Sequence, residues 1–137
     1  MWDIDTLKFK GGFLGHKNWI NSASVSPDMS LVCSGGEDKK LIVWDAEKRK
    51  EIQKFDTFEG AITHTAFHPS DQCVLVSTRN KTISMFDLRT EEIAQHYEAH
   101  HDSVNGFAVH PEGTHMVSVS ANSEVKVVMT RFRFGTL

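Results

Sequence analysis

Short apolar runs of roughly four to six residues follow one another along the chain, and turn-forming residues separate them. Clear examples are LVCSGG at 31–36, LIVWD at 41–45, CVLVST at 73–78 and HMVSVS at 115–120. Some runs alternate apolar and polar residues and others are continuously apolar, which is typical of strands buried on one face or on both. No segment carries an i, i+3, i+4, i+7 apolar stripe long enough for a helix. The pattern therefore predicts an all-β protein.

The runs recur with a fixed period. Pro27, Pro69 and Pro111 are 42 residues apart, and the same step, without a gap, relates three sets of apolar residues: Ile20, Ile62 and Val104; Val25, Phe67 and Val109; Leu41, Ile83 and Val125. A period of 42 lies within the roughly 40–45 residues of a four-stranded propeller blade. We therefore expect residues 1–137 to form one partial propeller of four-stranded antiparallel blades, about three blades plus part of another, with units at about 1–14 (partial), 15–56, 57–98 and 99–137.

Each unit is predicted to contain four strands joined by turns. The expected strands lie near 19–25, 31–35, 41–45, 51–55, 61–67, 73–77, 83–87, 92–97, 103–109, 115–119, 125–129 and 131–134. Asn105-Gly106 would locally suggest a hairpin turn. The register of the repeat places this dipeptide inside a strand instead, and we follow the register.

Composition and charge narrow the classes of function. The net charge is −3, so no basic field favours binding to nucleic acid. No apolar run approaches the roughly 20 residues of a membrane span, and the N-terminus lacks the layout of a signal peptide. Cys33 and Cys73 lie inside apolar stretches, which indicates reduced, buried thiols in a protein of the cytoplasm.

Gly15-His16, Ser34, Asp38 and Trp44-Asp45 resemble the complete signature of the WD40 repeat family. In that family the His, Ser, Asp and Trp side chains form a hydrogen-bonded set inside one blade. The resemblance implies that His16 bridges Asp38 and Ser34, and that the Trp44 indole donates to Ser34. A buried turn needs such pairing of its polar groups.

The later units depart from this signature, and we expect them to be less rigid locally. The second unit has Phe58, Val76, Asn80 and Phe86 in the four positions, which replaces most of a polar network by apolar contacts. The third unit keeps His100 and Ser118, but it has Asn122 and Val128 in the other two positions.

The sequence gives little support for an enzyme. Ser34, His16 and Asp38 are the residue types of a hydrolase triad, but all three occupy structural positions of the repeat. The eight histidines do not have the spacing of a metal site, and adjacent Glu91 and Glu92 would point to opposite faces of a strand. We expect no catalysis, no cofactor and no metal.

Within the WD40 proteins, several stretches resemble the last repeats of the proteome-of-centriole proteins. They are HKNWINSASVSPD, FHPSDQ, FDLRTEEIAQHYEAHHDSVNGFAVHPEG and SANSEVKVV. This resemblance implies a structural component of the centriole, basal body or ciliary axoneme that binds tubulin or proteins of the inner microtubule wall. The alternative is a soluble adaptor that presents a client protein to an enzyme complex, such as a ubiquitin ligase, a ribosome-associated scaffold or a microtubule-severing enzyme.

Binding is expected at a narrow face of the propeller, as is usual in WD40 proteins. The residues that should be exposed there are Lys17, Trp19, Glu37, Glu59, Arg79, His101, Asp102 and Ala121. Trp19 is the most interesting, because aromatic residues are enriched at interaction hot spots. The alternative for Trp19 is burial against a neighbouring blade, and we favour that alternative.

Three units cannot close a propeller, which usually has about four to eight blades. The remaining blades should come either from a longer polypeptide, which we favour, or from another chain. In both cases the open sheet edges predict that an isolated monomer is poorly soluble.

Overall fold

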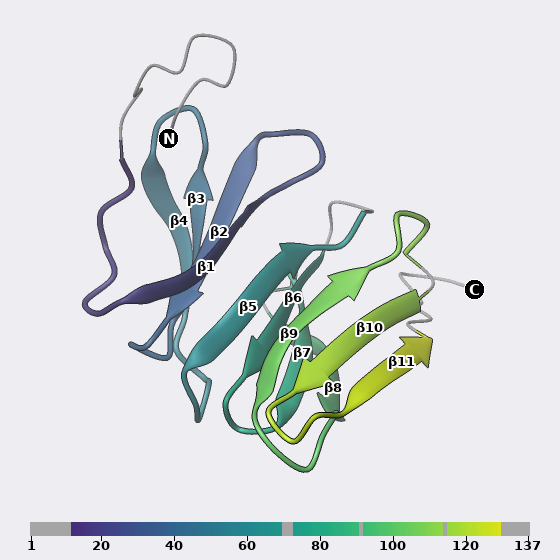
Figure 1. Cartoon of the computed structure of the whole chain (residues 1–137). Helices are drawn as coiled ribbons and strands as arrows, with labels where there is room; N and C mark the ends of the chain where they lie inside the picture. Colours follow the sequence, from purple (N-terminus) through teal and green to yellow (C-terminus); the bar gives the residue numbers. More distant parts are fainter. Residues whose placement is uncertain (1–11, 70–72, 91, 114, 130–137) are drawn as a thin grey trace, which may run out of the picture.

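Eleven strands in three antiparallel sheets make up the part of the chain that the structure describes (Figure 1). This structure is a computed structural model, and it describes residues 12–69, 73–90, 92–113 and 115–129. The first sheet has the order β1-β2-β3-β4, the second β5-β6-β7-β8, and the third β11-β10-β9. The predicted all-β class is confirmed.

The strand bounds agree with the predicted strands to within two residues. In the first sheet they are β1 Ile20–Val25, β2 Leu31–Gly36, β3 Leu41–Asp45 and β4 Lys50–Phe55. In the second sheet they are β5 Ile62–Phe67, β6 Cys73–Thr78, β7 Thr82–Asp87 and β8 Glu92–Glu98, and in the third β9 Val104–Val109, β10 His115–Ser120 and β11 Val125–Met129. Asn105-Gly106 lies within β9, as the register predicted. The strand expected near 131–134 and most of the partial unit at 1–14 lie outside the described residues.

The turns repeat with the same period as the strands. Lys39, Lys81 and Ser123 follow one another at 42-residue steps, and they have φ angles of 61°, 68° and 68°. Positive φ is uncommon in residues other than glycine. The tight turn between the second and third strands of each sheet therefore has a left-handed residue at the same position of the repeat.

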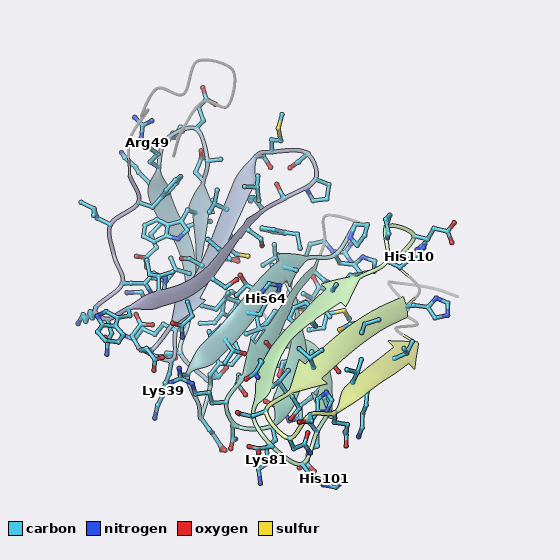
Figure 2. The ribbon with its side chains drawn as sticks, in the orientation of Figure 1. Lys39, Arg49, His64, Lys81, His101 and His110 are labelled. Atoms are coloured by element: carbon cyan, nitrogen blue, oxygen red, sulfur yellow. The ribbon has the colours of Figure 1, made fainter. Side chains whose placement is uncertain are left out.

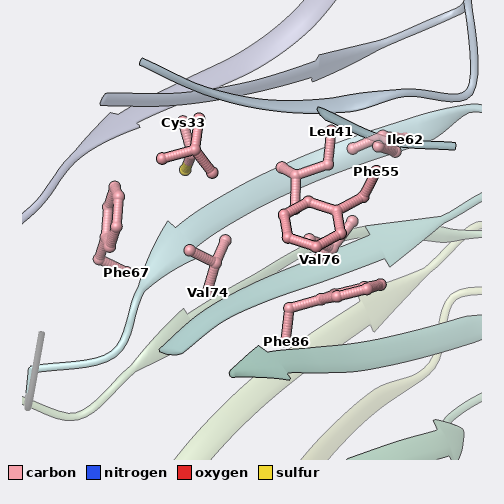
Figure 3. Packing of buried hydrophobic residues seen from close by; sticks show 9 residues of the cluster. Cys33, Leu41, Phe55, Ile62, Phe67, Val74, Val76 and Phe86 are labelled. Atoms are coloured by element: carbon pink, nitrogen blue, oxygen red, sulfur yellow. The ribbon is translucent and has the colours of Figure 1, made fainter. Parts of the chain in front are cut away.

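Two apolar layers hold the three sheets face to face. The first layer lies between the first and second sheets, where Cys33, Leu41 and Val43 pack against Ile62, Phe67, Val74, Val76 and Phe86 (Figure 3). The second layer joins the second and third sheets and contains Leu75, Ile83, Met85, Val104, Phe107 and Met116. The second sheet is thus covered on both faces, and all six residues of β6 are buried.

The first strand of each sheet along the chain (β1, β5 and β9) has a bulge at the same position. The pairing of β1 with β2 skips Asn21, that of β5 with β6 skips Thr63, and that of β9 with β10 skips Asn105. A bulge redirects the side chain of the extra residue. Asn21 and Thr63 point toward the next sheet, where Asn21 Nδ2 donates to the Ile62 carbonyl at 2.9 Å and Thr63 Oγ1 to the Val104 carbonyl at 2.6 Å.

Both cysteines are buried thiols in separate sheets. Burial raises the pKa of Cys33, and burial together with the nearby Asp87 carboxylate raises the pKa of Cys73 to about 12. These thiols are therefore poor nucleophiles at neutral pH. Within the described residues, no helix is long and apolar enough to cross a membrane.

Candidate functional site

Four polar side chains of the first sheet form one chain of hydrogen bonds. His16 precedes β1, Ser34 lies in β2, Asp38 in the β2–β3 turn and Trp44 in β3. His16 Nδ1 is 2.8 Å from Asp38 Oδ2, and His16 Nε2 is 2.7 Å from Ser34 Oγ. The Trp44 indole N–H donates to Ser34 Oγ at 2.9 Å. The structure therefore brings together all four residues that the sequence selected.

The Asp38 carboxylate is held in its charged form. Burial acts to raise its pKa, but hydrogen bonds from His16 and from the backbone amides of Lys17 and Lys40 outweigh burial and lower the pKa below its ordinary value. A carboxylate that accepts several hydrogen bonds is a stable anchor for a turn. Asp38 thus ties the segment before β1 to the β2–β3 turn.

The contacts of Ser34 argue against a hydrolase triad. The order Asp38–His16–Ser34 is present, but Ser34 is only 5% exposed and its oxygen already accepts the Trp44 N–H. A nucleophile must be within reach of the substrate. The geometry therefore pairs buried polar groups and does not present an attacking hydroxyl.

In the second sheet, aromatic packing stands where the first sheet has hydrogen bonds. The rings of Phe58 and Phe86 are 5.1 Å apart, and Phe55 adds a second ring 4.9 Å from Phe86. Asn80 turns outward and donates to Glu59 Oε2 at 3.1 Å. Because Phe58 and Phe86 stand in the positions of both His16 and Trp44, the polar groups are replaced together, which is why the replacement is tolerated.

The third sheet rebuilds a polar set with a residue that the sequence did not indicate. His100 Nε2 is 2.8 Å from Ser118 Oγ, and His100 Nδ1 is 2.9 Å from Glu124 Oε1. Glu124 stands two residues after Asn122, which occupies the position of Asp38. A longer side chain from a later position thus supplies the carboxylate. Hydrogen bonds from Lys126 and then from His100 lower the pKa of Glu124.

The predicted binding residues lie along one edge of the stacked sheets, which we call the narrow edge: Lys17, Trp19, Glu37, Glu59, Arg79, His101, Asp102 and Ala121. Lys39 and Lys81, in the tight turns after β2 and β6, lie on the same edge, although the sequence did not select them for binding. Figure 2 shows Lys39, Lys81 and His101 along this edge, whereas Arg49 and His110 lie on the opposite side. Trp19 belongs to the narrow edge because its carbonyl accepts the amide of Glu37 at 2.8 Å. The side chain of Trp19 is 79% exposed, so the favoured expectation of burial against a neighbouring blade is wrong in this structure.

An ion pair joins the first two sheets at the narrow edge. Arg79 contacts both carboxylate oxygens of Glu37, at 2.6 and 2.7 Å, and Asn21 donates to Glu37 at 3.1 Å. The hydrogen bonds from Asn21 and Arg79 lower the pKa of Glu37. Glu37 and Arg79 are therefore paired with each other, and sequence reasoning missed this because the two residues are 42 positions apart.

A cavity of about 550 Å³ is lined by residues of β7 and β8 and of the segments before β5 and after β8. Its walls include Phe58, Glu59, Lys81, Ser84, His96 and His101. Ser84 Oγ is 2.9 Å from His96 Nδ1. The cavity thus brings Glu59 and His101, two of the predicted binding residues, to one site. Asp102 lies next to His101, where its carboxylate accepts the Ser103 amide at 2.7 Å.

The histidines of the described residues do not form a metal site. His100 is buried and adjacent His101 is exposed, so their side chains point apart. Among the residues that the structure describes, no group of three or more His, Cys, Asp or Glu side chains could hold a metal ion. Glu92 begins β8 with an exposed side chain, and Glu91 lies outside the described residues.

Three segments of the chain match the repeat family described as "WD domain, G-beta repeat". The matched residues are 7–45, 49–87 and 91–128, so the matches start at 42-residue intervals. They include all four residues of the polar network in the first sheet.

Several curated proteins are similar to this chain. Small ribosomal subunit protein RACK1y of Oryza sativa subsp. japonica is 30% identical over 95 residues, which is 69% of this chain and 28% of the rice protein. Cross-pathway control WD-repeat protein 2 of Flammulina velutipes is 26% identical over 132 residues, 96% of this chain and 40% of the relative. A Lissencephaly-1 homolog of Caenorhabditis briggsae is 29% identical over 117 residues, 79% of this chain and 28% of the relative. The chain therefore spans well under half the length of these relatives.

Proposed function

This chain belongs to the WD40 repeat family, and from that premise we propose that it is a non-catalytic scaffold that binds other proteins through the narrow edge. The three sheets supply a rigid support, because two apolar layers and the bonds from Asn21 and Thr63 fix them to one another. Binding residues on such a support need little ordering when a partner arrives.

The exposure of Trp19 carries this proposal. A tryptophan that is 79% exposed leaves a large apolar surface in water, and aromatic residues of this kind are enriched at interaction hot spots. The charged rim beside it is already organised by the Glu37–Arg79 pair. An apolar centre with a polar rim is the usual arrangement of a protein interface.

At the finer level, we propose a structural component of the centriole, basal body or ciliary axoneme whose partner is tubulin or an inner-wall protein. The resemblance to the proteome-of-centriole proteins supports this choice. The exposed lysines of the narrow edge, Lys17, Lys39 and Lys81, suit the acidic surface of a microtubule. The protein would then act in the cytoplasm on the cytoskeleton.

The second candidate is a soluble adaptor, and the names of the relatives favour it. The rice relative is named as a small ribosomal subunit protein, and the fungal relative as a cross-pathway control protein. By analogy, this chain would hold a client next to a ribosome or an enzyme complex.

Co-sedimentation separates the two candidates. The chain is spun with taxol-stabilised microtubules in one series and with purified ribosomes in another, at two salt concentrations. A centriolar or axonemal component should pellet with microtubules, more strongly at low salt because the lysine contacts are screened by ions. An adaptor of the ribosome-associated kind should pellet only with ribosomes.

A matched pair of variants tests the narrow edge itself. Trp19→Ala should abolish pelleting, whereas Met29→Ala should not, because Met29 is 75% exposed in the turn between β1 and β2, on the opposite side. Lys39→Glu should also weaken the interaction, with Arg49→Glu as its control. Equal effects of Trp19→Ala and Met29→Ala would show that binding does not use the narrow edge.

A further inference from the structure

We propose that two copies of this chain join head to tail, with the outer face of the third sheet in one copy packed on the free face of the first sheet in the other. The proposal goes beyond the proposed function, because it concerns contact between copies and involves no other partner. It rests on the way in which the contacts between sheets repeat along the chain.

The same interface occurs twice within one chain. The first sheet presents Leu41 and Val43 to the second sheet, and 42 residues later the second sheet presents Ile83 and Met85 to the third. On the receiving side, Ile62 of β5 and Val104 of β9 occupy the same position of the repeat. All six side chains are at most 1% exposed.

The third sheet carries the next presenting face, and it is uncovered. Val125 and Val127 of β11 stand in the positions of Ile83 and Met85, but they are 66% and 67% exposed. Val117 and Val119 of β10 extend this apolar surface. Neighbouring exposed valines of this kind mark an interaction surface.

The first sheet carries the matching receiving face, and it is uncovered as well. Ile20 of β1 stands in the position of Ile62 and Val104, but it is 51% exposed. Val25 stands in the position of the buried Phe67 and is 55% exposed. One chain therefore has both halves of an interface that it already forms twice inside itself.

A polar contact fixes the orientation of this interface. The bulge residues Asn21 and Thr63 each donate a side-chain hydrogen bond to a carbonyl of the next sheet. Asn105 is the third bulge residue and its side chain is exposed. In the head-to-tail arrangement, Asn105 of one copy donates to the Ile20 carbonyl of the second copy, which corresponds to the Ile62 and Val104 carbonyls.

Two copies would cover both exposed apolar faces of the described sheets. A heterologous interface produces a ring if its rotation closes and an open filament if it does not. Two copies contribute six sheets, which lies within the roughly four to eight blades of closed propellers. In that ring each copy presents its valines once and receives valines once, so neither apolar face remains in water.

The mass of the purified chain in solution is the first test. Sedimentation equilibrium across a concentration series should give twice the protomer mass of 15.4 kDa. A species that stays at one protomer mass at every concentration would overturn the proposal. Because no partner is present, this result is independent of the co-sedimentation experiment.

Variants on the two faces test which surfaces meet. Val127→Asp and Ile20→Asp should each raise the dissociation constant of the dimer by on the order of tenfold or more, because each buries a charge in both interfaces of the ring. Ile52→Asp is the matched control, since Ile52 is 51% exposed but lies on the outer strand β4. Val127→Thr keeps the shape of the side chain and should weaken the dimer less. Circular dichroism verifies that each variant remains folded.

Mixing the two disruptive variants tests the head-to-tail geometry. Alone, each variant has no intact interface in a dimer. In a mixture, the valine face of Ile20→Asp meets the intact first sheet of Val127→Asp, so one interface is restored and dimers should reappear. If the mixture stays monomeric, the head-to-tail proposal is wrong. Pairing of one valine face with another would show itself differently, because Ile20→Asp would then form dimers without its partner variant.

Discussion

At the scale of single residues, the polar network of the first sheet gives buried polar groups their hydrogen-bond partners. Ser34 is its centre, because its oxygen contacts both Trp44 and His16. Removal of one partner from a buried hydrogen bond leaves the other without compensation. The stability of the β2–β3 turn should therefore depend strongly on this one hydroxyl.

We expect Ser34→Ala to lower the free energy of unfolding by about 1–3 kcal/mol, since two buried partners lose their bond. Ser118→Ala is the matched comparison in the third sheet. Ser118 pairs with His100. The position equivalent to Trp44 is Val128, so no indole N–H would lose its hydrogen-bond acceptor in Ser118→Ala. Urea denaturation of both variants should show the larger loss for Ser34→Ala. Equal losses would mean that the Trp44 bond contributes nothing.

The residue scale also shows where prediction from sequence fails. His16, Ser34, Asp38 and Trp44 could be selected because they lie within 29 positions of one another in a known pattern. Glu124 could not, because the pattern points to Asn122. Only the path of the chain after β10 shows that the longer side chain of Glu124 reaches His100.

At the scale of elements, close packing between sheets limits the size of certain residues. A Cβ atom on Gly35 would lie 2.5 Å from Ile62 Cγ2, across the boundary between the first and second sheets. A Cβ atom on Gly106 would have no neighbour within 4 Å. Both glycines lie in strands, so they differ mainly in what lies opposite.

Gly35→Ala should therefore destabilise the protein by about 1–3 kcal/mol, because the added methyl group forces the sheets apart. Gly106→Ala should be close to neutral. Thermal unfolding followed by circular dichroism measures both. A neutral Gly35→Ala would show that the first two sheets are packed more loosely than the structure has them.

Two histidines at the boundaries of the second sheet make stability depend on pH. Burial lowers the pKa of His64, whose ring meets that of Phe107 at 4.8 Å, and burial also lowers the pKa of His68, which contacts the Gly113 carbonyl at 3.2 Å. The unfolded chain therefore binds more protons than the folded chain below about pH 6.5. Stability should be fully present above that pH and should fall as the pH drops through the folded pKa values.

The variant His64→Phe keeps an aromatic ring against Phe107 and cannot be protonated, so its stability should fall less between pH 7 and 5. His101→Gln serves as the control, because His101 is exposed. The measurement is the midpoint of urea unfolding at each pH. An unchanged pH dependence in His64→Phe would exclude His64 as a source of the effect.

At the scale of the whole molecule, the backbone amides of the second sheet, in the middle of the stack, should be protected most strongly from hydrogen exchange. The second sheet is covered on both faces, whereas the first and third sheets each have one open face. Amide hydrogen exchange reports such differences in local stability. We expect β6 and β7 to exchange most slowly and β1 and β11 to exchange faster, when measured by mass spectrometry in the Val127→Asp variant to remove contacts between copies. Uniform exchange across the three sheets would contradict this ranking.

The sequence by itself determined the architecture. The 42-residue step, the apolar positions that follow it and the turn residues between them are local patterns, and local patterns predict strands and their order. The register even placed Asn105-Gly106 correctly inside β9, against the local turn signal. These features depend on neighbours a few positions away or on simple repetition, so one sequence was enough.

Only the tertiary structure decided which side chains meet across sheets. Glu37 and Arg79 pair, Asn21 and Thr63 donate to the next sheet, and Trp19 remains exposed. Each of these outcomes depends on how two sheets are placed relative to each other, and that placement follows from side-chain packing between residues about 42 positions apart. Met85 and Val127, for example, are both apolar residues at the same position of the repeat, so the sequence pattern does not distinguish them. They differ only in whether another sheet lies opposite them.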